Sequence, residues 1–159
     1  MNSDTPVPFT IRRAAPGDEA IIVALLKELA VFEKLEPRFT LDQVQVTRDL
    51  FGREKAAVCD LAFAGAEPAG LALWFWTYRS FGAERGLFIE DLYVKPQFRG
   101  QGLGTMFFAH LAGQGARLEW RVLDWNEKAL AFYRRLGARP LADWLTYELE
   151  GEALKRLSA

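Results

Sequence analysis

A glycine-rich turn, "RGQGLG" at residues 99–104, joins a stretch typical of a buried strand to a stretch typical of a helix. The first stretch is "GLFIEDLYV" (86–94) and the second is "LGTMFFAHLAG" (103–113). The N-terminus of a helix carries unpaired N–H groups and the positive end of the helix dipole, so it attracts anions. Glycines let an anion approach these amides, and Arg99 adds a positive charge. The turn therefore predicts a phosphate-binding site, with close packing of the helix on the strand as the alternative.

The form of the turn excludes two well-known phosphate-binding motifs. It lacks the Gly-Lys-Ser/Thr ending of a nucleoside-triphosphate P-loop. It also follows several strands, too late in the chain for the first β-α-β unit of a dinucleotide-binding fold. The kind of phosphate stays open at this point.

The hydrophobic pattern predicts alternating strands and helices. "FTIRR" (9–13) alternates like a short strand, and apolar residues at steps of three and four predict a helix from Asp18 to Phe32. Thr40 and Gln43 form a capping-box signature for a second helix, which Gly52 closes in a left-handed conformation. The later elements are expected in this order: strands 56–64 and 69–79 as a hairpin, strand 86–94, helix 103–113, strand 116–124, helix 127–137 with Gly137 as its C-terminal cap, strand 143–150 and a helical turn at 151–157.

This order of elements predicts an α/β fold, a mixed sheet with helices on both faces. Residues 9–159 are expected to form a single domain, and residues 1–8 a loose tail. Ligands of such sheets gather where strands end and helices begin. The glycine turn lies at such a place.

The overall charge and composition narrow the range of partners. The chain has 159 residues and a formal charge of −1, so no global positive field favours nucleic acid. Its longest apolar run, "AGLALWFW", is far shorter than the roughly 20 residues that cross a bilayer. A single cysteine, Cys59, and a start without a secretory signal favour the cytoplasm. We therefore expect neither nucleic acid nor membrane as a partner.

Several motifs in one order resemble a known family. The pattern Arg99-x-x-Gly102-x-Gly104 follows "EDLYV", and "WNEKALAFYRRLGA" (125–138) comes later. Together they resemble the acetyl-CoA-binding core of the GCN5-related N-acetyltransferases (GNAT). The stretches "LLKELAVFEKLE", "LFGRE", "WFWTYRSFGAERGLFIEDLYVKPQFRGQGLG" and "GEALKRL" are similar to the diamine acetyltransferase branch, which includes the spermidine/spermine and thialysine enzymes. The likeness covers nearly the whole chain.

The resemblance implies a fold, a reaction and a co-substrate. The GNAT fold has a mixed, mostly antiparallel central sheet, and its members move an acetyl group from acetyl-CoA directly to an amine, often as homodimers. In the family the diphosphate of acetyl-CoA lies on the glycine turn, and its pantetheine arm runs along the preceding strand. The residues that the resemblance assigns to acetyl-CoA are Leu92, Tyr93, Val94, Arg99, Gly100, Gln101, Gly102, Leu103, Gly104, Asn126 and Tyr133.

Glu90 is the candidate general base. An alkylammonium with a pKa of about 10.4 must lose a proton before its nitrogen can attack. Glu90 lies in an apolar strand at the ligand end of the sheet, and the alternative is a carboxylate that only pairs with an arginine. Asp91 points to the opposite face of a regular strand unless a bulge intervenes. The resemblance to the diamine branch favours Glu90 as the base, acting directly or through a water.

Tyr133 is the candidate partner of the departing sulfur. The apolar stripe of its helix is typical of a core tyrosine with one hydrogen bond, whereas the resemblance places it beside the thioester sulfur. A phenol with a pKa of about 10 gives its proton slightly uphill to a thiolate whose acid has a pKa of about 8.5. A hydrogen bond to the sulfur is therefore the alternative to proton donation. Asn126 suits both an N-cap and a cofactor contact, and an N–H near Leu92 is expected to bind the thioester oxygen.

Two other reactive residues are expected to be structural. Cys59 lies in an apolar strand, so a buried thiol is favoured over a nucleophile that carries the acetyl group. His110, the only histidine, has no cluster of partner ligands, so no metal site is expected.

Carboxylates and aromatic rings attract a cationic amine, so Phe32, Glu33, Glu90 and Asp91 are the expected acceptor contacts. Solvated surface charge is the alternative for Glu33. The stretch "TYRSF" has Arg79 where polyamine-specific members have an acidic residue, which favours a lysine analogue such as thialysine, whose α-carboxylate an arginine can bind. A diamine or polyamine, a protein or peptide acceptor, and a non-catalytic acetyl-CoA-binding module stay open as alternatives.

Overall fold

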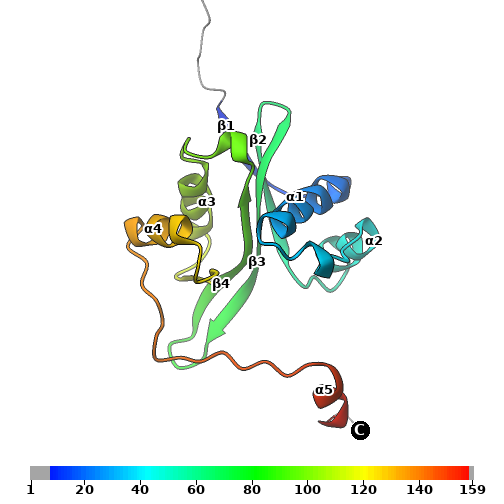
Figure 1. Ribbon diagram of the computed structural model, residues 1–159, viewed down its shortest axis with the longest axis vertical. Coiled ribbons are helices and arrows are strands. Elements are labelled where there is room, and N and C mark those ends of the chain that lie inside the picture. Colours follow the sequence, from blue (N-terminus) through cyan, green and yellow to red (C-terminus); the bar gives the residue numbers. More distant parts are fainter. Residues whose placement is uncertain (1–7, 158–159) are drawn as a thin grey trace, which may run out of the picture. The chain divides into compact units, whose positions relative to one another are not determined.

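The computed structural model describes residues 8–157 (Figure 1). The chain forms two compact units, Met1–Arg121 and Val122–Ala159, and each is described by itself. Apart from Pro8, the tail expected at residues 1–8 lies outside the described residues. None of the described helices combines the length and the apolar character needed to span a membrane.

The first unit is built on a five-stranded sheet in the order β1-β2-β3-β4-β5. Neighbours from β1 to β4 pair antiparallel, whereas β4 and β5 pair parallel. This arrangement confirms the mixed, mostly antiparallel sheet expected from the sequence. The strands are β1 (Phe9–Arg13), β2 (Val58–Ala64), β3 (Glu67–Arg79), β4 (Glu84–Val94) and β5 (Leu118–Trp120).

Helices lie on both faces of this sheet, as expected (Figure 1). On one face lie α1 and α2, and on the other lies α3. A 3-10 turn, η1, follows α1, and a π-helical turn, η2, continues α2. The bounds are α1 (Glu19–Phe32), η1 (Glu36–Arg38), α2 (Gln43–Val46), η2 (Thr47–Phe51), η3 (Pro96–Phe98) and α3 (Leu103–Ala112).

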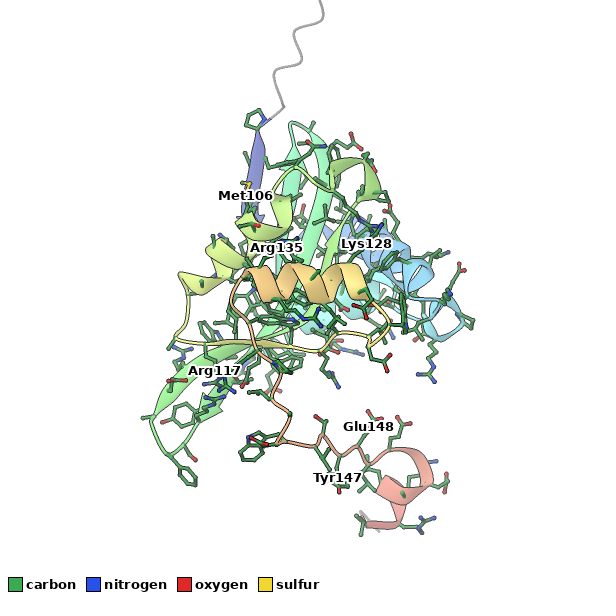
Figure 2. The ribbon with its side chains drawn as sticks, turned by 60° about the vertical axis from the view of Figure 1, so that its left-hand side comes forward. Met106, Arg117, Lys128, Arg135, Tyr147 and Glu148 are labelled. Carbon is green, nitrogen blue, oxygen red and sulfur yellow. The ribbon has the colours of Figure 1, made fainter. Side chains whose placement is uncertain are left out.

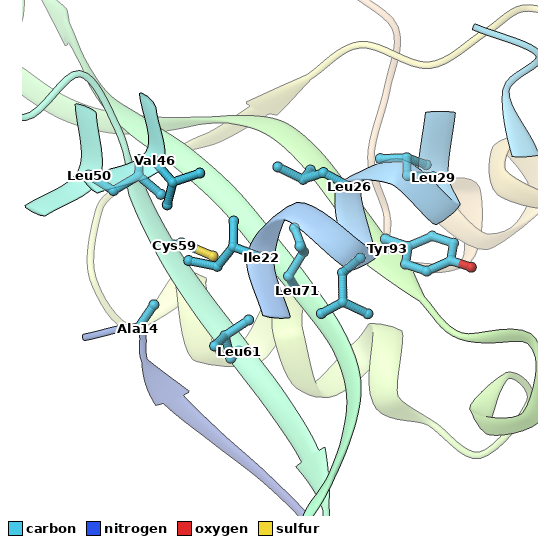
Figure 3. Packing of buried hydrophobic residues seen from close by; sticks show 11 residues of the cluster. Ala14, Ile22, Leu26, Leu29, Val46, Leu50, Cys59, Leu61, Leu71 and Tyr93 are labelled. Carbon is cyan, nitrogen blue, oxygen red and sulfur yellow. The ribbon is translucent and has the colours of Figure 1, made fainter. Parts of the chain in front are cut away.

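The main core lies between α1 and the sheet (Figure 3). Along α1, four buried residues follow one another at steps of three and four: Ile22, Leu25, Leu26 and Leu29. Burying each such side chain contributes about 1.5–3 kcal/mol to folding. The stripe therefore fixes the C-terminal end of α1 near β4. Its partners on the strands include Leu61, Leu71 and Tyr93.

A buried carboxylate joins the strands to α3. Asp60 of β2 is fully buried and accepts hydrogen bonds from Arg13 Nε at 2.8 Å and from Trp74 Nε1 at 2.7 Å. His110 of α3 lies with its Nε2 atom 3.5 Å from the same carboxylate. Because a buried charge is tolerated only when it is paired, the cluster holds β1, β2, β3 and α3 in one arrangement.

The second unit contains α4 (Glu127–Arg135) and α5 (Gly151–Leu157). The Asn126 side chain caps α4 by accepting a hydrogen bond from Ala129 N at 3.2 Å. At the other end, Gly137 has a φ of +82°, the left-handed conformation of a C-terminal cap. Both caps confirm the sequence prediction for this helix.

The predicted capping box of the second helix is wrong by two residues. The box consists of Asp42 and Gln45, and each side chain accepts a hydrogen bond from the other residue's N–H at 2.8 Å. The sequence had favoured Thr40 and Gln43. Both patterns overlap in "TLDQVQ", and the helix begins only at Gln43.

The prediction for Gly52 is also wrong. Its backbone is extended, with φ −68° and ψ −178°, rather than left-handed. The helix ends in the π-helical turn, and a Cβ atom at Gly52 would collide with the carbonyl group of Arg48. A close approach of the backbone, not a positive φ, therefore requires glycine here.

Two expected strands are shortened or missing. Of residues 116–124 only Leu118–Trp120 form a strand, and residues 143–150 form none within the described part of the chain. Exposed apolar side chains in that segment include Trp144, Leu145 and Tyr147. Figure 2 shows Tyr147 and Glu148 on opposite sides of the extended segment before α5. An alternating pattern becomes a strand only where a neighbour accepts its hydrogen bonds.

Candidate active site

A β-bulge at Glu90 shapes the candidate site. In the pairing of β3 with β4, Leu73 lies opposite Asp91 but Trp74 lies opposite Ile89, so Glu90 has no opposite residue. A bulge adds one residue to a strand and changes the direction of the side chains around it. This is the exception under which the sequence allowed Glu90 and Asp91 to share a face.

The Glu90 carboxylate pairs with an arginine. Arg121, just after β5, places its Nη2 atom 3.3 Å from both oxygens of Glu90. The guanidinium also lies 5.4 Å from the centre of the Phe88 ring. The Glu90 side chain is 42% exposed, so it remains accessible to water. The arginine-paired carboxylate considered as an alternative is thus present, and it still borders the site.

Asp91 lines a cavity of ≈ 280 Å³ between α1 and β4, here named the α1–β4 cavity. Its walls are mostly apolar and come from α1, from the connection between α1 and α2, and from Leu73 of β3. Burial first, and then the nearby Glu90 and Glu33 carboxylates, raise the pKa of Asp91 to about 6 against the opposing charge of Arg121. This carboxyl group therefore sits where a cation would be favoured.

Glu33, at the C-terminal end of α1, lines the same cavity. Desolvation by burial raises the pKa of its carboxyl group as well. Within residues 8–157, neither Glu33 nor Asp91 accepts a side-chain hydrogen bond or forms an ion pair. Two unpaired carboxyl groups in one mostly apolar cavity suit an ammonium ligand. Phe32 packs its ring against the guanidinium of Arg99 at 4.9 Å, and its predicted contact with the acceptor remains a prediction.

The glycine turn has the geometry of an anion site. Gly100 and Gly102 have φ values of +75° and +85°, and a Cβ atom at either would point into open space. Met106 N donates the first intrahelical hydrogen bond, to Gly102 O at 3.0 Å. The amides of residues 103–105 are therefore left without a partner in the helix. Backbone donors of this kind fit a diphosphate.

The side chains of Arg99 and Gln101 hold the turn rather than extend from it. Arg99 Nε donates to Val94 O at 2.8 Å, and its guanidinium lies 5.6 Å from the Tyr93 ring centre. Gln101 Nε2 donates to Gln97 O at 2.9 Å. The positive charge of Arg99 thus lies at the base of the turn, and the backbone amides form its surface.

The end of β4 is open on one side. Among the described strands, β5 pairs with β4 only over Leu87, Phe88 and Ile89. Beyond Ile89 the pairing of the two strands ends, and no described strand pairs with residues 92–94 on that side. Tyr93 itself is buried and donates its hydroxyl to Glu28 Oε2 at 3.1 Å. The open edge suits a ligand with amide groups of its own.

Tyr133 and Asn126 belong to the second unit. Tyr133 lies on α4, with its ring centre 5.5 Å from that of Phe132. Asn126 acts as the N-cap of the same helix. The roles predicted for both residues at the site remain predictions.

Two other residues considered from the sequence, Cys59 and Arg79, lie in structural positions. Cys59 is buried, and burial raises the pKa of its thiol to about 12, which opposes a thiolate nucleophile. Arg79, considered for an α-carboxylate, pairs with Glu119 at 2.7 Å. Residues 8–157 contain no group of three His, Cys, Asp or Glu side chains that could hold a metal ion.

Sequence reasoning missed two arginines. Arg121 pairs with Glu90, and Arg38 lines the α1–β4 cavity. Arg38 lies in a connecting segment without periodicity, and Arg121 is one of several charged residues in the expected strand 116–124, so no pattern singled them out. The run of charges in "FEKLEPR" is the one sequence signal that indicated Arg38.

Comparisons with known proteins agree with this geometry. The model of the "Acetyltransferase (GNAT) family" matches residues 23–138. Thialysine N-epsilon-acetyltransferase of Bos taurus is 33% identical over 164 residues, which cover 93% of this chain and 96% of that protein. L-ornithine N5-acetyltransferase NATA1 of Arabidopsis thaliana is 36% identical over 94 residues, 56% of this chain and 41% of that protein.

A solved structure shares the fold. An integron cassette protein from the mobile metagenome of V. cholerae superposes with a TM-score of 0.80 at 22% sequence identity. The match covers 94% of this chain and 97% of that one. At this identity the likeness concerns the fold alone.

Proposed function

Since the chain belongs to the acetyltransferase (GNAT) family and is an N-acetyltransferase of small-molecule amines, we propose that its acceptor is a lysine analogue or a short diamine. The α1–β4 cavity carries this proposal, because Glu33 and Asp91 present two unpaired carboxyl groups inside mostly apolar walls. The names of the thialysine and ornithine acetyltransferases among its relatives support it.

The acetyl donor of the proposal is acetyl-CoA. When bound, it supplies an acetyl thioester as the electrophile. The amides of residues 100–104 would donate to its diphosphate, with the charge of Arg99 behind them. The open edge formed by Leu92, Tyr93 and Val94 would pair with its pantetheine arm, and Asn126 would contact the same arm.

In this proposal, carboxylates bind the ammonium group of the acceptor and remove its proton. Asp91 and Glu33 hold the ammonium by charge-assisted hydrogen bonds, which places its nitrogen beside the bulge of β4. Glu90 takes the proton directly or through a water, and its exposed side chain can then pass the proton to solvent. The pairing with Arg121 keeps Glu90 in one position.

In this proposal, a tyrosine stabilises the departing sulfur. Tyr133 donates a hydrogen bond to the sulfur. In the alternative, it transfers its proton to the sulfur. The N–H near Leu92 binds the thioester oxygen, on which negative charge develops. The amine attacks directly, without an acetylated enzyme.

The test is thiol release from acetyl-CoA with a panel of acceptors. The panel contains thialysine, lysine, ornithine, putrescine, spermidine and a set of peptides. We expect release with the small amines, and a loss of kcat of about 10²-fold or more in Glu90→Gln and Tyr133→Phe, as general acid–base groups typically contribute. Release with peptides alone would overturn the small-molecule acceptor, and release with no amine would favour a binding module.

The proposal includes a second copy of the chain as a partner. Apolar side chains are exposed along the segment before α5, including Leu141, Trp144, Leu145, Tyr147 and Leu149. A row of this kind favours burial against another surface, so we propose a homodimer. A cytoplasmic location completes the proposal, supported by the single, buried cysteine Cys59.

A further inference from the structure

Arg38 places a positive charge in a cavity that otherwise carries negative groups. It lies on η1 and lines the α1–β4 cavity together with Glu33 and Asp91. Among the described residues, the side chain of Arg38 has no carboxylate partner. Carboxylates do pair with these other arginines: Arg12, Arg13, Arg48, Arg79, Arg117 and Arg121. An unpaired guanidinium at a cavity points to an anionic ligand group.

The backbone around Arg38 is well fixed. Lys34 adopts a φ of +61°, and Leu35 N donates to Ala30 O at 2.8 Å. Arg38 N then donates to Leu35 O at 2.9 Å. Leu35 and Phe39, on either side of η1, also line the cavity. The segment is thus anchored to α1 by its backbone and to the cavity by its apolar side chains.

The charged side chains that line the cavity come from different elements: Glu33 from the end of α1, Arg38 from η1 and Asp91 from β4. The charges that shift the pKa of Asp91 come from Glu90, Glu33 and Arg121, and not from Arg38. Asp91 lies next to the bulge of β4, and Arg38 lies on η1 in the connection between α1 and α2. Apolar side chains such as Leu29 and Leu73 line the same cavity. Acidic, apolar and basic side chains in one cavity match a molecule with an ammonium, an aliphatic chain and a carboxylate.

We propose that Arg38 binds the α-carboxylate of the acceptor and selects amino acids with a terminal side-chain amine. The inference rests on the proposed function, in which Asp91 and Glu33 hold the reacting amine. A planar guanidinium binds a carboxylate through two parallel hydrogen bonds. A diamine or polyamine instead brings a second ammonium toward the guanidinium, and this like-charge contact disfavours it.

The test compares acceptors that differ only in the carboxylate. Lysine is paired with cadaverine and ornithine with putrescine, and kcat/KM is measured for each with acetyl-CoA in excess. We expect Arg38→Gln to lower the ratio of kcat/KM for lysine to kcat/KM for cadaverine by about 10- to 100-fold. This is the size of effect that a charge-assisted contact has. The change lies in KM for lysine, because the carboxylate is bound equally before and during transfer. For cadaverine, kcat/KM rises as the repulsion is removed.

Two controls separate a direct contact from a general effect on the fold. Arg53 is exposed and does not line the cavity, so Arg53→Gln should leave the ratio unchanged. Arg38→Lys should restore part of the preference for lysine, because it keeps the charge but not the paired hydrogen bonds. The melting temperature and KM for acetyl-CoA report on folding in every variant.

The outcomes keep the two proposals apart. Equal losses for lysine and cadaverine in Arg38→Gln, or an unchanged ratio, would overturn the role of Arg38 while acetylation itself stands. Absence of thiol release with every amine in the wild-type protein would overturn the proposed function, and with it the premise of this inference.

Discussion

At the scale of the residue, Asp91 is where binding and stability oppose each other. The pKa of its carboxyl group rises from 3.8 to about 6, because of burial first and of Glu90 and Glu33 next. The fold therefore disfavours the ionised form. This destabilisation is fully present above about pH 6 and absent below the unfolded value of 3.8. A bound ammonium offsets it.

Asp91→Asn keeps the size of the side chain and removes its charge. At pH 8 we expect the free energy of unfolding to exceed that of the wild-type protein by up to about 3 kcal/mol, the equivalent of a pKa raised from 3.8 to about 6. The gain should vanish near pH 4, where the wild-type carboxyl group is also neutral. Urea denaturation at both pH values measures this, and KM for the amine should increase in the same variant.

Asp49→Asn is the matched control, because Asp49 is paired with Arg48 and Arg48 holds its pKa below the usual value. No stabilisation at pH 8 is expected from that change. An Asp91→Asn protein that is less stable than the wild type at pH 8 would contradict the unfavourable burial of this carboxylate.

Sequence patterns identified the carboxylates of the site but not their directions. Glu90 and Asp91 are visible as acidic residues in an apolar strand. Their orientation depends on a bulge, which arises from the pairing of β3 with β4 and not from either strand alone. Arg38 was missed because residues in connecting segments follow no period, and Arg121 because the expected strand 116–124 contains several charged residues.

At the scale of the element, the turn before α3 was predictable because its chemistry is local. Gly102 is the N-cap of α3 with a φ of +85°, a conformation that glycine adopts without strain. The strand before it and the helix after it were both found where the sequence placed them. The strand predicted at 143–150 is absent because a strand depends on non-local structure: its backbone hydrogen bonds need a partner from another part of the chain.

Gly102→Ala should weaken acetyl-CoA binding. A left-handed conformation costs an alanine roughly 1–2 kcal/mol, and the added methyl group lies on the surface where the diphosphate would bind. We expect KM for acetyl-CoA to rise several-fold, or the turn to relax with the same result. Steady-state kinetics with acetyl-CoA varied at a saturating amine measures the effect.

Gly113→Ala provides the comparison at the other end of α3. Gly113 has a φ of −69°, and the nearest atom to an added Cβ lies 3.6 Å away. This variant should retain the wild-type KM for acetyl-CoA. Equal behaviour of the two variants would argue against a role of the Gly102 turn in binding.

At the scale of the whole molecule, the family resemblance was the strongest guide. Several motifs in a fixed order predicted the sheet type and the acetyltransferase activity, which no single motif determines. The oligomeric state is harder to predict, because the sequence and structure of a single chain do not show what it binds. The exposed row from Leu141 to Leu149 is the feature that bears on it.

We expect the protein to be a dimer in solution and the segment before α5 to support it. Leu145→Glu combined with Tyr147→Glu places two charges on side chains that are 79% and 89% exposed in the single chain. If this segment is an interface, the double variant is monomeric, because a charge is costly to bury there. Light scattering coupled to gel filtration measures the mass.

Val44→Glu is the control for added surface charge. Val44 is 77% exposed on α2, away from that segment in the sequence, so this variant should keep the wild-type mass. A monomeric wild-type protein, or a double variant with an unchanged dimer mass, would refute the proposed interface.

The parting of β4 from β5 after Ile89 has a consequence for tolerance to mutation. A carrier arm that joins the sheet there is recognised by main-chain groups, which every amino acid supplies alike. The side chains along that edge would then be constrained by packing, as the buried Tyr93 is, and not by contact with the proposed donor. Selectivity for the acceptor, which we propose depends on a few charged side chains, could then diverge on a scaffold that keeps the proposed donor.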